Sequence, residues 1–121
     1  MKILIADDNE DDAQFLSRWL SEEGHECVRA RDGEAALAIL REETPDLLIS
    51  DILMPRMDGF ALCRAVKRDP VWRNIYFIFC TATYTDERDA ALALQIGAQR
   101  FFAKPVEIDR LLAVLAEIEE G

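Results

Sequence analysis

The sequence has neither an excess of basic residues nor a long hydrophobic run. Fourteen Lys and Arg stand against 24 Asp and Glu, which gives the 121-residue chain a formal net charge of −10. Binding to nucleic acid and attraction to anionic membranes both need clustered Lys and Arg, so neither partner is expected. The apolar run at 3–6 ends at Asp7, which is too early for a signal peptide or a membrane span. We therefore expect a cytoplasmic protein.

Cysteine, histidine and glycine are also scarce. The three cysteines, Cys27, Cys63 and Cys80, form no C-x-x-C pair, so buried thiols in a reducing compartment are expected. The one histidine, His25, has no partner at a spacing that suits zinc. The five glycines are scattered and form neither a P-loop nor a dinucleotide-binding loop. Any phosphoryl group that this chain handles must therefore come from an external donor.

The sequence does contain short apolar runs that alternate with segments of helical periodicity. Nearly unbroken runs predict strands buried on both faces of a parallel sheet, at 3–6, 47–49, 75–80 and 101–103. Residues 26–30 alternate polar and apolar side chains, as a half-exposed edge strand does. Helices are predicted around 13–20, 36–40, 60–66, 91–96 and 108–118. The last has one apolar stripe, formed by Ile108, Leu111, Leu112, Leu115 and Ile118.

Five strands alternating with five helices predict an α/β three-layer sandwich of the (βα)5 type. Right-handed crossovers place helices on both faces of the parallel sheet. Of the two common doubly wound arrangements, the flavodoxin-like strand order 2-1-3-4-5 is favoured over the Rossmann order. No linker, repeat or low-complexity segment interrupts the chain, so residues 1–121 are expected to form a single domain.

Ligands of such sheets bind beyond the carboxyl ends of the strands. Charged or reactive side chains follow four of the predicted strands: Asp7 and Asp8 the first, Asp51 the third, Thr81 the fourth and Lys104 the fifth. They are expected to meet at one edge of the sheet. Neighbouring carboxylates raise one another's pKa, and a divalent cation relieves this repulsion. Carboxylates, a carbonyl and water suit Mg²⁺.

A carboxylate beside a bound cation can act as a nucleophile toward phosphorus and form an aspartyl phosphate. Asp51 is the candidate, because residues 52–55 separate it from any helix that it could cap. Phosphoryl transfer needs positive charge and hydrogen-bond donors around the phosphoryl oxygens, which Lys104 and Thr81 supply. The acidic residues at 11–12 are interpreted as charges that stabilise the start of a helix.

The motifs around these residues resemble the receiver domain of response regulators, as in CheY-like proteins and hybrid sensor kinases. They are Ile-Ala-Asp-Asp-Asn (5–9), Asp-Ile-Leu-Met-Pro-Arg-Met-Asp-Gly (51–59), Thr-Ala (81–82) and Lys-Pro (104–105). The resemblance covers essentially the whole chain and agrees with the strand order 2-1-3-4-5. It implies a signalling phosphoacceptor rather than an enzyme. The donor would be the phosphohistidine of a histidine kinase or histidine phosphotransferase, with Mg²⁺ or alternatively Mn²⁺ as the metal.

The resemblance also implies roles for individual residues. The phosphoacceptor would be Asp51, and the metal ligands would be Asp7, Asp8, Asp51 and the backbone carbonyl of Leu53. The residues that bind the phosphoryl group or switch with it would be Thr81, Ala82, Phe101 and Lys104. The residues that shape loops would be Pro55, Gly59 and Pro105, the last of which favours an extended Lys104 and a cis bond. The positions that tune dephosphorylation would be Leu53 and Thr83.

Phosphorylation is expected to switch the surface formed by the fourth helix, fifth strand and fifth helix. That surface would bind a downstream protein or a fused output domain, with contact candidates Tyr84, Gln95, Gln99 and Arg100. An apolar Leu53 gives water no hydrogen bond, so a long-lived phosphorylated form is expected. The segment from Thr81 to Lys104 is one residue longer than in common members. A monomer or weak homodimer is expected, and both a stand-alone regulator and a receiver cut from a longer protein remain open.

Three other functions fit the sequence less well. A haloacid-dehalogenase-type hydrolase needs a second acid two residues after its nucleophile, but Asn9 follows Asp7 at that distance. A flavodoxin-like cofactor binder needs a phosphate-binding loop, which the scattered glycines do not provide. A receiver used only as an unphosphorylated docking module has no need of the complete set of acidic, threonine and lysine residues.

Overall fold

The computed structural model describes residues 1–83 and 86–121, and within them five parallel strands alternate with five helices. The strands are β1 (Lys2–Ala6), β2 (Glu26–Ala30), β3 (Leu47–Ser50), β4 (Tyr76–Thr81) and β5 (Arg100–Ala103). The helices are α1 (Glu10–Glu22), α2 (Gly33–Glu42), α3 (Gly59–Arg68), α4 (Glu87–Ile96) and α5 (Ile108–Glu120). The sheet order β2-β1-β3-β4-β5 confirms the predicted α/β fold.

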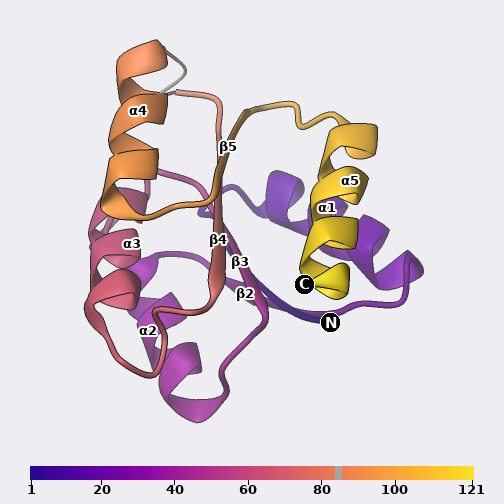
Figure 1. The fold of residues 1–121 in the computed structure, drawn as a ribbon, viewed down its shortest axis with the longest axis horizontal. Coiled ribbons are helices and arrows are strands. Elements are labelled where there is room, and N and C mark those ends of the chain that lie inside the picture. Colours follow the sequence, from indigo (N-terminus) through magenta and orange to yellow (C-terminus); the bar gives the residue numbers. More distant parts are fainter. Residues whose placement is uncertain (84–85) are drawn as a thin grey trace.

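The sheet separates two hydrophobic cores, as Figure 1 shows: α1 and α5 cover one face, and α2, α3 and α4 cover the other. Successive side chains of a strand point to opposite faces. Accordingly, Ile3 and Ile5 of β1 join the core under α1 and α5, whereas Leu4 and Ala6 join the other. Burial on both faces explains why the central strands are unbroken apolar runs in the sequence.

Two sequence expectations about exposure were wrong. Residues 101–103 were predicted to be buried on both faces, but β5 is an edge strand in which only Phe102 is buried. In α5, Leu112 was predicted to be part of the buried stripe but is exposed. Val114, which was not included in that stripe, is buried instead. A short apolar run does not distinguish an edge strand from a central one, and a helical stripe shifts when the helix turns slightly about its axis.

The loop between β3 and α3 folds back tightly on its own start. The N–H of Gly59 donates to the carbonyl of Ile52 at 2.7 Å. A Cβ on Gly59 would lie 2.1 Å from the carbonyl oxygen of Asp51, so a larger residue does not fit without moving the backbone. The position of Asp51 therefore depends on a glycine eight residues later.

The same loop is attached to the start of α2. Arg56 has a left-handed backbone (φ 65°), and its Nη1 donates to Oδ2 of Asp32 at 3.1 Å. Asp32 is 1% exposed, and it also caps α2 by accepting from the N–H of Ala35 at 2.7 Å. The N–H of Gly33 donates to the carbonyl of Met57 at 3.0 Å. An ion pair and a backbone hydrogen bond thus hold one side of this loop.

We predict that Gly59→Ala destabilises the fold by about 3 kcal/mol, the upper range for overpacking, because the added methyl group collides with the Asp51 carbonyl. Gly24→Ala is the matched control: there is open space around Gly24, but φ is 94°, so a cost of about 1 kcal/mol is expected. Urea denaturation followed by circular dichroism measures both. Equal losses for the two variants would contradict the collision.

Candidate functional site

The site lies at the carboxyl edge of the sheet, where parallel hydrogen bonding continues one residue beyond the strands. The N–H of Asp7 donates to Ala30 O at 2.9 Å, and the N–H of Asp51 donates to Ala6 O at 2.8 Å. The N–H of Lys104 donates to the carbonyl of Thr81 at 2.8 Å. These backbone bonds fix where each functional side chain leaves the sheet.

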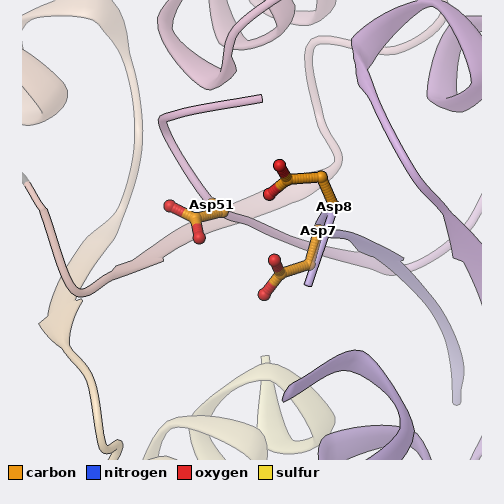
Figure 2. Close-up of side chains that lie close together, drawn as sticks. All are labelled: Asp7, Asp8 and Asp51. Carbon is orange, nitrogen blue, oxygen red and sulfur yellow. The ribbon is translucent and has the colours of Figure 1, made fainter. Parts of the chain in front are cut away.

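Asp7, Asp8 and Asp51 form an acidic triad, and each offers a carboxylate oxygen within 4.8 Å of the others. Figure 2 shows Asp7 and Asp8 next to each other, with their carboxylates turned toward the side on which Asp51 lies. Asp7 and Asp51 are buried, and Asp8 is exposed. Mg²⁺ binds oxygens at about 2.1 Å, which places neighbouring ligands roughly 3–4 Å apart. The donor set therefore suits a small divalent cation after a slight contraction.

Lys104 supplies the positive charge within this group. Its Nζ donates to Oδ2 of Asp7 at 2.8 Å, to Oδ2 of Asp51 at 2.9 Å and to Oδ2 of Asp12 at 2.7 Å. An ammonium group has three N–H donors, so each donor has a carboxylate partner. The lysine holds together two strand ends and the first turn of α1.

Burial and neighbouring charges shift the pKa values of Asp7 and Lys104. Burial raises the pKa of Asp7, and the charge of Asp51 adds to this, while hydrogen bonds from Lys104 and Asn9 oppose it. Burial alone would lower the pKa of Lys104, but its hydrogen bonds to carboxylates outweigh that cost, and the pKa lies above its ordinary value. The ammonium therefore stays charged at neutral pH and offsets part of the repulsion among the carboxylates.

Backbone groups orient the two buried carboxylates. The N–H of Ile52 donates to Oδ1 of Asp51 at 2.6 Å, and the N–H of Asn9 donates to Oδ1 of Asp7 at 3.0 Å. Each carboxylate thus has one oxygen held by its own chain and one oxygen turned toward Lys104. Such held oxygens are placed for ligand binding without searching among rotamers.

A cavity of about 390 Å³ opens beside Asp51, and Ala82, Lys104 and Pro105 are among the residues that line it. Cys80 is another lining residue, and burial raises the pKa of its thiol to about 12. A thiol with that pKa is protonated at neutral pH and is no nucleophile. Cys80 therefore adds no negative charge to this part of the site.

The structure places the other predicted residues around this centre. Thr81 is buried at the end of β4, where its hydroxyl oxygen accepts from the N–H of Thr83 at 3.2 Å. The side chain of Leu53 is 52% exposed in the loop after Asp51. Phe101 is half-buried and packs on the core beneath α2, α3 and α4. The roles that the resemblance assigns to these residues stay predictions.

The loop-shaping residues are also in place. The peptide bond between Lys104 and Pro105 is cis. The carbonyl of Pro55 accepts from the N–H of Met57 at 2.7 Å, within the tight loop that Gly59 closes.

Sequence reasoning missed one side chain of the site. Asp12 was interpreted as a charge at a helix start, yet its carboxylate contacts Lys104. Its partner lies 92 residues along the chain, so no local spacing in the sequence signals the contact. Asp11, in the same turn, is exposed.

The residues suggested as partner contacts differ in their exposure and in their contacts within the chain. Gln95 and Arg100 are exposed, and Arg100 pairs with Glu117 at 2.8 Å. The side-chain oxygen of Gln99, in contrast, accepts from the N–H of Phe77 at 2.8 Å. Gln99 thus supports the sheet beside Phe77, and its role as a partner contact stays a prediction. Tyr84 lies outside the described residues.

The chain has clear relatives among known proteins. The family described as response regulator receiver domain matches residues 3–116. Response regulator PleD of Caulobacter vibrioides is 39% identical over 113 residues, which are 93% of this chain but 24% of PleD. Protein PilH of Pseudomonas aeruginosa is 32% identical over 120 residues, 99% of this chain and 98% of PilH. The chain thus spans about a quarter of one relative and nearly all of another.

Solved structures agree with these relatives. The signal receiver domain of a signal transduction histidine kinase from Syntrophus aciditrophicus is 38% identical, with a TM-score of 0.87 over 97% of this chain and 88% of that one. None of the helices in the described part of the chain is long and apolar enough to span a membrane. By its sequence match, its fold and its acidic triad, the chain belongs to the response regulator receiver domain family, whose members are phosphoacceptor modules of two-component signalling rather than enzymes.

Proposed function

We propose that Asp51 accepts a phosphoryl group from the phosphohistidine of a histidine kinase or histidine phosphotransferase. One observation carries this assignment: the buried Asp51 carboxylate lies 2.9 Å from the Lys104 ammonium and within 4.8 Å of the other triad carboxylates. In the transfer, a carboxylate oxygen of Asp51 forms a bond to phosphorus while the bond from phosphorus to the histidine nitrogen breaks. The imidazole leaves with that electron pair and takes a proton from solvent.

The acidic triad and the backbone carbonyl of Leu53 would hold a divalent cation, and Mg²⁺ fits this set of hard oxygen donors better than a softer metal does. When bound, the cation supplies positive charge next to the carboxylates and the incoming phosphoryl oxygens. Mn²⁺ prefers the same donors and is the alternative. Asp51 would thus be both a metal ligand and the nucleophile.

Lys104 and Thr81 would bind the phosphoryl oxygens once Asp51 is modified. Lys104 already donates to Asp51, so a small movement brings its ammonium to an oxygen attached there. Thr81 lies at the end of β4, the strand that pairs with β3, which ends just before Asp51. The small side chain of Ala82 leaves the cavity beside Asp51 open to a phosphoryl group.

Phosphorylation would then shift the surface formed by α4, β5 and α5. Phe101 in β5 links that surface to the core, since it is half-buried against the same core as Ala93 and Ile96 of α4. A change at Thr81 can therefore be transmitted through the paired β4 and β5 strands. The occupant of this surface would be a downstream protein or a fused output domain, and residues 1–121 would form one receiver, either alone or within a longer protein.

We predict that incubation with acetyl phosphate and Mg²⁺ gives a phosphate-mass adduct by intact mass spectrometry. Asp51→Asn removes the nucleophilic oxygen and abolishes the adduct. Asp11→Asn alters the net charge by the same amount at an exposed position, and this variant keeps the adduct. If Asp51→Asn formed the adduct in undiminished amount, the phosphoacceptor would have to be a residue other than Asp51.

We predict that Mg²⁺ raises the thermal midpoint of the protein. At ten times the Kd, binding stabilises the folded state by about 1.4 kcal/mol, or roughly 5 °C for a domain of this size. Asp8→Asn removes one exposed ligand and should lose most of the rise, while Asp109→Asn, an exposed carboxylate in the first turn of α5, should keep it. Differential scanning fluorimetry with EDTA as the metal-free reference measures this, and equal rises in both variants would exclude Asp8 as a ligand.

We predict that the phosphorylated form lasts for minutes or longer, because the apolar Leu53 offers water no hydrogen bond near Asp51. Leu53→Asn supplies such a group and should speed phosphate release several-fold. Val71→Asn, another change of an exposed apolar residue, should have no effect. A phosphate-release assay decides between these outcomes, and loss of phosphate from the unaltered protein within seconds would refute the prediction.

A further inference from the structure

The first turn of α1 contributes a carboxylate that the proposed metal and phosphoryl chemistry does not use. The Oδ2 of Asp12 accepts from Lys104 Nζ at 2.7 Å, which is as short as the bonds from Lys104 to Asp7 and Asp51. The side chain of Asp12 is 45% exposed, whereas those of Asp7 and Asp51 are about one-tenth exposed. Asp12 thus binds the lysine from the solvent side and the strand-end carboxylates bind it from within.

The position of Asp12 is fixed by local structure. Its N–H donates to Oδ1 of Asn9 at 3.0 Å, and this cap begins α1 directly after Asp8. The cap brings the first helical turn over the carboxyl edge of the sheet. The Lys104 contact therefore comes from a defined helix start rather than from a freely moving side chain.

A divalent cation in the acidic triad would compete with Lys104. Lys104 and the cation need the same two carboxylates, Asp7 and Asp51, and the two positive charges repel each other at close range. When a cation binds, a lysine with no other partner must either keep its hydrogen bonds to these carboxylates or turn its ammonium group out into solvent. Asp12, which lies outside the acidic triad, offers a partner that Lys104 can retain while it releases the other two.

We propose that Asp12 is a positioning residue, which holds the Lys104 ammonium at the rim of the site while the triad carboxylates bind a divalent cation. This inference rests on the proposed function, because it takes the acidic triad as the metal ligands. It assigns Asp12 no contact with metal or phosphorus. Its effect reaches the reaction through Lys104 alone, by lowering the cost of freeing Asp7 and Asp51.

The experiment is a Mg²⁺ titration by isothermal titration calorimetry on the whole chain and its variants. Asp12→Asn removes the carboxylate with little change in shape, and Asp11→Asn removes the same charge from the same helical turn at an exposed position. Both variants lose one negative charge from the first turn of α1, so each weakens the general attraction for a cation and the interaction with the helix start. High ionic strength screens the general attraction further.

We expect Asp12→Asn to bind Mg²⁺ about threefold more weakly than Asp11→Asn, the size of a partly exposed ion pair, at both low and high ionic strength. In the Lys104→Met background, the two asparagine variants should have equal affinities, because Asp12 then has no lysine to hold. The Lys104→Met variants also show whether the loss of Mg²⁺ affinity in Asp12→Asn depends on the lysine or on the stability of the helix.

Each other outcome overturns the inference. Equal affinities in the presence of Lys104, or tighter binding by Asp12→Asn, would show that Asp12 is only a helix-start charge. A gap that persists in the Lys104→Met background would show that Asp12 acts on the cation directly. Absence of Mg²⁺ binding by the unaltered chain would instead overturn the proposed function, and this inference with it.

Discussion

The arrangement of the site depends on one electrostatic constraint, which is that carboxylates held at neighbouring strand ends repel each other. Asp7 and Asp51 are both buried, and Asp8 stands next to them. Lys104 offsets this repulsion by donating to Asp7 and Asp51. A pair of buried carboxylates with one shared ammonium is stable, yet it keeps a net negative charge that favours a cation. Lys104 thus offsets part of the repulsion and leaves a site whose charge attracts a cation.

The parallel sheet creates this constraint. In register, Ala6 of β1 pairs with Ser50 of β3, so the residues that follow them emerge side by side. β4 and β5 repeat the relation, with Thr81 opposite Ala103 and Lys104 next. Helices on both faces bury the central strands β1, β3 and β4, and the side chains that follow these strands lie at the carboxyl edge of the sheet. The core thus determines where chemistry is possible, and the residue type at each strand end determines what that chemistry is.

The strand ends were predictable from the sequence because unbroken apolar runs stop sharply at Asp7, at Asp51 and before Lys104. The contact of Asp12 was not, since an acidic residue in a first helical turn has a sufficient local reason to be there. The edge position of β5 and the exposure of Leu112 also escaped prediction, because they depend on which neighbour covers a surface. The pairing of Arg56 with Asp32 joins residues 24 apart and has no local pattern.

That last pairing has a consequence for movement within the domain. The ion pair between Arg56 and Asp32, together with the bond from Gly33 to Met57, anchors the loop after Asp51 to a helix on the face opposite α1 and α5. A left-handed arginine costs about 1 kcal/mol of backbone energy, which this anchor offsets. One wall of the site is therefore held to α2 at two points, so a movement of this loop on ligand binding has to break these contacts or carry α2 with it.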